Sequence, residues 1–148
     1  MRPLTKPISI ALLAVVAILI SGDAEAAPQK VKVLIVTGFD VDSHKWEEST
    51  KLIDVILRET GRFDLTISTD KEVFATLKPD DYHTVVLHYG FWNESDPSEN
   101  AKAGLLNYAK AGGNIVALHF ACSSFQDWKE YGILLGRVWK KGVGGHGP

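Results

Sequence analysis

The chain has 148 residues, of which 45% are hydrophobic, 16 are basic and 18 are acidic, so its formal net charge is −2. A nearly neutral chain without a block of like charge lacks the basic face that nucleic-acid binding needs, and we expect no nucleic-acid partner. Cys122 is the single cysteine, so there is no internal disulfide and stability must come from the burial of apolar side chains.

The first 26 residues have the parts of a secretory signal peptide. Arg2 and Lys6 give a positive start, and Ile8 to Ile20 is almost unbroken apolar sequence. Small residues at Ala24 and Ala26 predict cleavage after Ala26. The apolar run is shorter than the about 20 residues of a membrane span, so we expect no stable span after cleavage and a secreted or periplasmic protein. An uncleaved anchor is the alternative.

Strands alternate with helices through residues 27–148, which we expect to form one domain. The expected strands are short runs rich in β-branched residues, over residues 31–36, 63–68, 84–88 and 114–118. The expected helices run from Ser43 as the cap to Thr60, from residue 69 or 70 to before Pro79, from Asp96 as the cap to Gly112, and from Ser124 to Leu135. This alternation predicts an α/β fold with a three-layer, doubly wound, mainly parallel sheet.

Polar residues gather where the predicted strands end. In open parallel sheets, ligands bind in the crevice at the carboxyl ends of the strands. Asp42 and His44 follow the first strand, and His119 follows the fourth. We expect the substrate-binding residues in the same crevice, and they are Gly38, His88, Trp92 and Asn93.

His119 stands at the predicted turn from the last strand into a helix. Ala117 and Ala121, two positions before and after it, are the small residues that a nucleophile elbow needs. A histidine at that apex would project from the sheet near a helix N-terminus. The alternative is a core histidine that bonds to a neighbouring loop. Cys122 follows closely, but a free cysteine is commonly a small buried hydrophobe.

Several histidines could contribute to a metal site at this crevice, since zinc favours nitrogen and oxygen ligands. The candidates are His44, His88, His119 and His146, with Asp40 or Asp42. No pair has a diagnostic metal-binding spacing, so scattered polar histidines are the alternative. Aromatic residues near the strand ends suit a sugar site but are equally ordinary core material.

Three segments resemble the N-terminal part of a ThuA-like (trehalose-utilisation) domain. They are VLIVTG with a following His-x-Trp (residues 33–46), YHTVVLHYG (82–90), and YAKAGGNIVALHFACSSFQDWKEYGILLG (108–136) with Gly145 and His146 after it. The resemblance covers nearly all of residues 31–148 and implies the class I glutamine amidotransferase-like fold. The family domain is longer, so we expect this one to be incomplete at its C-terminus.

The resemblance also implies a role in the use of disaccharides or keto-sugars, with a small carbohydrate as the partner. In the family, a histidine replaces the amidotransferase cysteine at the elbow, and His119 matches it. A histidine there cannot form the thioester, so the protein is not a glutamine amidotransferase. By analogy, His119 and His146 could hold a divalent metal such as zinc. Lys45 stands where the family usually has an acid.

These features predict an exported carbohydrate-active enzyme, a hydrolase or an isomerase, with His119, His44 and Asp42 as its catalytic residues. His119 would act as a general base or a metal ligand, and His44 would assist it. Asp42 would orient an imidazole. The alternative is a non-catalytic sugar-binding module of the same fold, in which His119 is a hydrogen-bond partner only.

Overall fold

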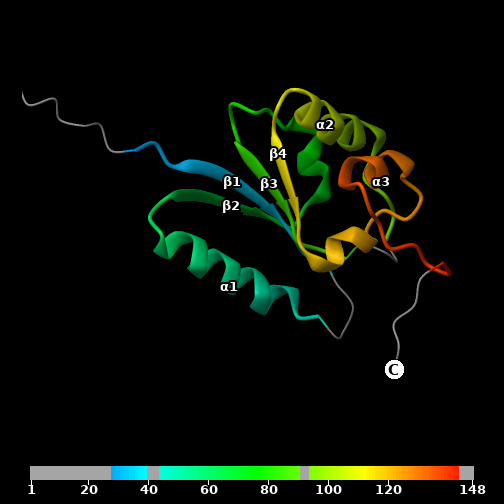
Figure 1. Ribbon diagram of the computed structural model, residues 1–148, viewed down its shortest axis with the longest axis horizontal. Helices are drawn as coiled ribbons and strands as arrows, with labels where there is room; N and C mark the ends of the chain where they lie inside the picture. Colours follow the sequence, from blue (N-terminus) through cyan, green and yellow to red (C-terminus); the bar gives the residue numbers. More distant parts are fainter. Residues whose placement is uncertain (1–27, 40–43, 91–93, 144–148) are drawn as a thin grey trace, which may run out of the picture.

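The computed structural model describes residues 28–39, 44–90 and 94–143 (Figure 1). Its strands are β1 (Val31–Val36), β2 (Phe63–Ser68), β3 (Thr84–Leu87) and β4 (Asn114–Ala117). They form one parallel sheet in the order β2-β1-β3-β4. The helices are α1 (Trp46–Glu59), α2 (Glu99–Lys110) and α3 (Lys129–Leu135), with 3-10 turns η1 (Lys71–Thr76) and η2 (His119–Ser123).

The helices lie on both faces of the sheet, which confirms the predicted α/β fold (Figure 1). Alternate side chains of each strand point to opposite faces. Val33 and Ile35 of β1 belong to the core beneath α1, whereas Leu34 and Val36 belong to the core beneath α2 and α3. Burial on both sides accounts for the continuous apolar run of this strand.

The face opposite α1 carries the larger core. Phe74 of η1 is 0% exposed and packs against α2. Helix α2 approaches η1 so closely that a methyl group on Gly104 would lie 2.0 Å from the carbonyl oxygen of Phe74. Tyr131 of α3 donates its hydroxyl hydrogen to the carbonyl of Ala121 at 2.8 Å and stacks on Trp128. This face is therefore densely packed from η1 to α3.

Helix α1 covers its face of the sheet only in part. Ile53 and Leu57 pack on the sheet, whereas Leu52 and Ile56 are 60% and 55% exposed. Val116, the partner of Val86 across β3 and β4, is 43% exposed on the same face. The described residues therefore leave apolar surface uncovered on this side of the sheet.

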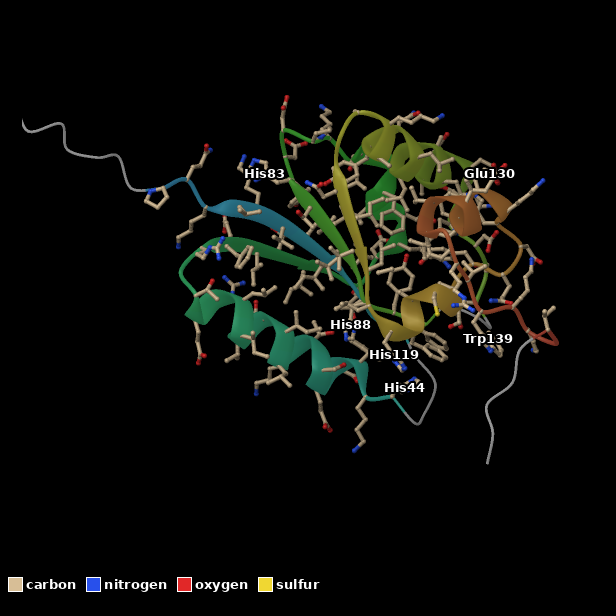
Figure 2. The ribbon with its side chains drawn as sticks, viewed as in Figure 1. His44, His83, His88, His119, Glu130 and Trp139 are labelled. Carbon is tan, nitrogen blue, oxygen red and sulfur yellow. The ribbon has the colours of Figure 1, made fainter. Side chains whose placement is uncertain are left out.

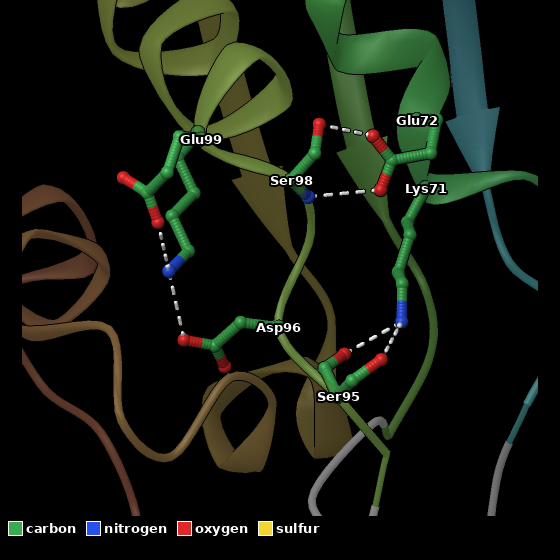
Figure 3. Close-up of polar contacts among 7 residues, drawn as sticks. Lys71, Glu72, Ser95, Asp96, Ser98 and Glu99 are labelled. Carbon is green, nitrogen blue, oxygen red and sulfur yellow. Dashed lines mark hydrogen bonds and ion pairs between the residues drawn. The ribbon is translucent and has the colours of Figure 1, made fainter.

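The α-helices α1, α2 and α3 all begin later than predicted. Ser98, not Asp96, caps α2, because its hydroxyl accepts the Ala101 N–H at 3.2 Å while the Asp96 carboxylate pairs with Lys102. Glu72 of η1 accepts hydrogen bonds from the Ser98 N–H and hydroxyl, which fixes this cap from a second element (Figure 3). Helix α1 begins at Trp46, and its N-cap is Lys45 rather than the predicted Ser43, which lies outside the described residues.

The last helix starts at Lys129 rather than Ser124. The chain first forms η2, and Phe125 then has a left-handed φ of 51°. A residue in that region interrupts an α-helix, so the helix can begin only later. Among the described residues, no helix is long and apolar enough to cross a membrane. The predicted signal peptide lies outside these residues.

Candidate functional site

A pocket of about 280 Å³ lies between the start of α1 and the segments that follow β3 and β4. Three of the predicted site residues line it, His44, His88 and His119, and Figure 2 shows them gathered at this end of the sheet. The rest of the lining is Lys45, Ser49, Tyr89 and Phe120. The structure thus brings together side chains from three segments that are distant in the sequence.

His119 has the backbone of a tight turn. Its φ of 38° lies in the left-handed region, which costs energy for a residue with a side chain. The Leu118 N–H donates to Leu87 on β3 at 3.0 Å, and the Ala121 N–H closes the turn on Leu118 at 2.9 Å. Ala121 is completely buried, in line with the predicted need for a small residue, whereas Ala117, for which the same need was predicted, is exposed. The expected α-helix N-terminus beside His119 is wrong, because the 3-10 turn η2 follows instead.

His44 and His119 lie side by side. Their ring centroids are 5.2 Å apart and their planes are nearly perpendicular, at 84°. Phe120 contacts His44 with ring centroids 4.5 Å apart and gives the pocket an apolar wall. Two imidazoles in this arrangement can face different atoms of one bound molecule.

His88 is fixed by its backbone and its ring. Its N–H donates to the carbonyl of Val36 at 2.8 Å, so the strand pairing continues to the edge of the pocket. Its Nε2 lies 2.9 Å from the hydroxyl oxygen of Ser49 on α1. Sequence reasoning missed Ser49, because no local pattern marks a serine whose partner is 39 residues away.

Close contacts beside the pocket fasten its segments together, and of the residues that make them only Tyr89 lines the cavity. The hydroxyls of Thr37 and Thr50 are 2.9 Å apart and join the end of β1 to α1. Gly38 has a φ of 125°, and a Cβ there would lie 2.9 Å from the Cβ of Thr69, so its conformation and packing require glycine. Tyr89 is 2% exposed, and burial raises the pKa of its phenol well above the ordinary value, so the group stays protonated. The substrate-binding role of Gly38 stays a prediction.

Several predicted site residues fall outside the part of the chain that the structure describes. They are Asp40, Asp42, Trp92, Asn93 and His146. Within residues 28–39, 44–90 and 94–143, no group of three His, Cys, Asp or Glu side chains could hold a metal ion. The described residues therefore do not make a metal site by themselves. The pairing of His119 with His146 around zinc stays a prediction.

Cys122 lies apart from the three histidines. It is half-buried in η2, and its carbonyl accepts the Trp139 N–H at 3.0 Å. It lines a different cavity with Arg137, Val138 and other residues of the C-terminal segment. The pocket of the histidines is therefore built without a thiol.

Comparisons with known proteins agree with this architecture. The family model ThuA, described as trehalose utilisation, matches residues 32–145. A solved structure of a ThuA-like protein from Parabacteroides merdae ATCC 43184 aligns with a TM-score of 0.58 and 29% identity. The alignment covers 70% of this chain and 37% of that one, so this chain spans less than half of that protein's length. No curated protein matches the chain.

Proposed function

Because the chain belongs to the ThuA family, described as trehalose utilisation, we propose that it is an exported domain that binds a small carbohydrate in the histidine pocket and acts on it. The single observation that carries the proposal is the convergence of His44, His88 and His119 on one cavity at the carboxyl ends of parallel strands. That edge is where open α/β sheets bind their ligands.

The proposed chemistry is proton transfer. Imidazole is the side chain that most readily takes up and gives back a proton near neutral pH. His119 takes the proton of the acidic C–H bond beside a keto group of the sugar. The electron pair of that bond forms a C=C bond, and the C–O bond of the neighbouring carbon breaks. His44, 5.2 Å away between ring centroids, returns a proton to the oxygen that leaves. Asp42 orients one of these imidazoles.

The pocket supports a small ligand. Its volume of about 280 Å³ is at the low end for small-molecule sites, so we propose that one sugar unit enters it. Phe120 supplies an apolar wall and Ser49 a hydroxyl. Gly38, Trp92 and Asn93 complete the proposed binding surface.

A decisive experiment compares binding with turnover for trehalose and its keto derivatives. Calorimetry reports binding, and chromatography of the sugars reports turnover, with and without added zinc. We expect His119→Ala to lower turnover by about 10²–10⁴-fold, the usual contribution of a general base, while the sugar still binds. His83→Ala is the matched control, because His83 bonds to the Lys32 N–H and lies away from the pocket (Figure 2). Absence of binding to every sugar would overturn the proposal.

The second candidate function is a sugar-binding module without catalysis. The contact of Phe120 with His44 favours it, since an aromatic wall beside polar groups suits sugar binding even where no reaction occurs. Intact binding together with no turnover of any sugar would establish this alternative. His119→Ala would then weaken binding rather than abolish a reaction.

Export is proposed from residues 1–26. Expression of the full chain with its own N-terminus should yield a product that begins at Ala27 in the periplasm or the medium. Mass spectrometry of the recovered protein measures this directly. A product that keeps Met1 and stays with the membrane would show that the segment is an uncleaved anchor.

A further inference from the structure

A second cavity, which we call the β2 cavity, lies between β2 and η1 on the face of the sheet opposite α1. Its volume is about 430 Å³, against about 280 Å³ for the histidine pocket. It is lined by Lys32 and Asp64, which are partners near the starts of β1 and β2, and by Asp81 and Tyr82, which precede β3. The β2 cavity is therefore at the amino ends of the strands. Figure 2 shows the adjacent His83 at the other end of the sheet from the three histidines of the pocket.

The packing of η1 leaves the β2 cavity open. Alternate residues of β2 point to opposite faces, so Leu65 is buried on the side of α1 while Asp64 and Thr66 point to the side of η1. Phe74 packs η1 against α2, so that η1 stands beside β2 rather than over it. Asp64 and Thr66 are therefore exposed, and they form the polar side of the cavity.

The charged groups of the β2 cavity do not cancel one another by contact. The Lys32 ammonium donates to the carbonyl of Asp80 at 3.1 Å, which uses one of its three hydrogens. Among the residues that the structure describes, the carboxylates of Asp64 and Asp81 form neither an ion pair nor a hydrogen bond. Two carboxylates and one ammonium thus line the cavity with hydrogen-bonding capacity left for a ligand.

The opposite side of the β2 cavity is apolar and firmly held. Val73, Leu77 and Tyr82 line it and pack against the large core. The Tyr82 carbonyl accepts the hydroxyl hydrogen of Tyr108 at 3.0 Å, which ties this segment to α2. Small-molecule sites have volumes of about 300–1,000 Å³ and combine apolar lining with a few polar groups. The β2 cavity has both properties.

The mixture of lining groups selects the chemical class of the ligand. An anion is disfavoured because the two carboxylates and one ammonium sum to a charge of −1. A simple cation would pair with the carboxylates but leave the Lys32 hydrogens without an acceptor. A hydroxyl can both donate to Asp64 or Asp81 and accept from Lys32. We infer that the β2 cavity is a binding site for a neutral sugar unit, whose C–H face lies against the apolar side.

Amide NMR of the intact chain tests the site with glucose as the probe. We expect glucose to shift the backbone signals of Asp64, Thr66 and Tyr82 saturably. Glucuronate, which adds one negative charge, should bind about fivefold more weakly. Tighter binding of glucuronate than of glucose, or no shift of these signals by glucose, would overturn the inference. Binding of glucosamine without binding of glucose would show that the carboxylates hold only a cation, and would also overturn it.

Two substitutions on the exposed side of β2 test the contacts. Asp64→Ala should weaken glucose binding about tenfold, the effect of one hydrogen bond to a charged group. It should also narrow the preference for glucose over glucuronate, which a purely structural effect would not do. Thr66→Val keeps the shape of the side chain and should weaken binding about threefold. Unchanged binding in both variants would contradict the proposed contacts and overturn the inference.

Asp80→Ala is the matched control. Asp80 is exposed and adjoins Asp81, but its side chain does not line the β2 cavity, and the substitution keeps the carbonyl that holds Lys32. Glucose binding should therefore be unchanged in this variant. A loss as large as that in Asp64→Ala would mean that binding depends on the general charge of the surface, and would overturn the inference.

The β2 cavity and the histidine pocket can be followed separately in the same spectra. His119→Ala changes the histidine pocket and should leave the glucose-induced shifts of residues 64, 66 and 82 unaltered; loss of those shifts would overturn the inference. If sugars shift only these signals, the proposed function of the histidine pocket fails and this inference stands. If they shift only signals around the three histidines, the reverse holds.

Discussion

On the face of the sheet that α2 and α3 cover, the side chains of Phe74, Leu105 and Tyr131 are 0% exposed. On the other face, Leu52 and Ile56 of α1 are 60% and 55% exposed. The first face has aromatic and aliphatic side chains in one continuous core, and the second has a smaller core between α1 and the sheet. The described chain therefore derives most of its hydrophobic stabilisation from one side of the sheet.

The histidine pocket belongs to the less covered side. Val86 faces α1 and Leu87 faces the opposite core, so His88 faces α1 again, where it meets Ser49. The groups proposed to do chemistry thus stand apart from the groups that dominate stability. A substitution of His44 or His88 in the pocket should change function with little effect on folding, and a substitution in the large core should do the reverse.

The sharpest test of this difference removes one large side chain from each face. Phe74→Ala should lower the free energy of unfolding by about 3–5 kcal/mol, because it leaves a cavity in a fully buried cluster. Leu52→Ala should change it by less than about 0.5 kcal/mol, because Leu52 is mostly in solvent. Urea unfolding followed by circular dichroism measures both. Equal losses would show that the two faces contribute alike.

Substitutions of two glycines, Gly104 and Gly132, test how closely α2 packs against η1 in the large core. Gly104→Ala should destabilise the chain by about 1–3 kcal/mol, because the added methyl would meet the Phe74 carbonyl and push α2 away from η1. Gly132→Ala in α3 is the control, since its methyl would lie 3.4 Å from Val138 and only make ordinary contact. Thermal unfolding should show a lower midpoint for the first variant and an unchanged or higher midpoint for the second.

The pocket side stores strain at His119, which two substitutions can reveal. Both His119→Gly and His119→Ala remove the imidazole, but only glycine adopts a φ of 38° without cost. We expect the alanine variant to be less stable than the glycine variant by about 1 kcal/mol. Chemical denaturation of the pair gives the difference. Equal stability would argue against a left-handed backbone at this turn.

The smallest effect concerns the cap of α2. Hydrogen bonds from the Ser98 hydroxyl and N–H lower the pKa of Glu72 below its ordinary value of 4.5. A lowered pKa in the folded state means that this contribution to stability is complete above about pH 5 and is lost as the pH falls through the folded pKa. The stability difference between wild type and Glu72→Gln should therefore shrink in acid. Ser98→Ala should weaken this pH dependence, and an unaltered one would contradict the assignment.

The strands were predictable almost to the residue because their signal is local. Runs of β-branched residues between turn residues gave the observed bounds for β1 and β2, and β3 and β4 end one residue early. The helix starts were harder, because Asp96 and Ser98 are both good caps. Two contacts decide between them. Glu72, which is distant in sequence, bonds to Ser98, and Lys102, which lies one turn later, pairs with Asp96.

The site was predictable to the extent that topology determines it. Parallel strand order brings the segments after β3 and β4 together, so the sequence alone places His88 and His119 at one edge of the sheet. Ser49 could not be found in this way, because its importance depends on the rotation of α1 over the sheet. The same rotation leaves Leu52 and Ile56 outside the core, although their spacing is that of an apolar face.

The stacking of Trp128 on Tyr131 has an optical consequence. The two rings are 5.5 Å apart between centroids and inclined by 25°, and Trp128 is only 6% exposed. Trp46 begins α1 on the opposite face and is half-buried. A chain that keeps Trp128 as its sole tryptophan should emit at short wavelength and give strong near-ultraviolet dichroism. A chain that keeps only Trp46 should emit further to the red, so that fluorescence follows each side of the sheet separately.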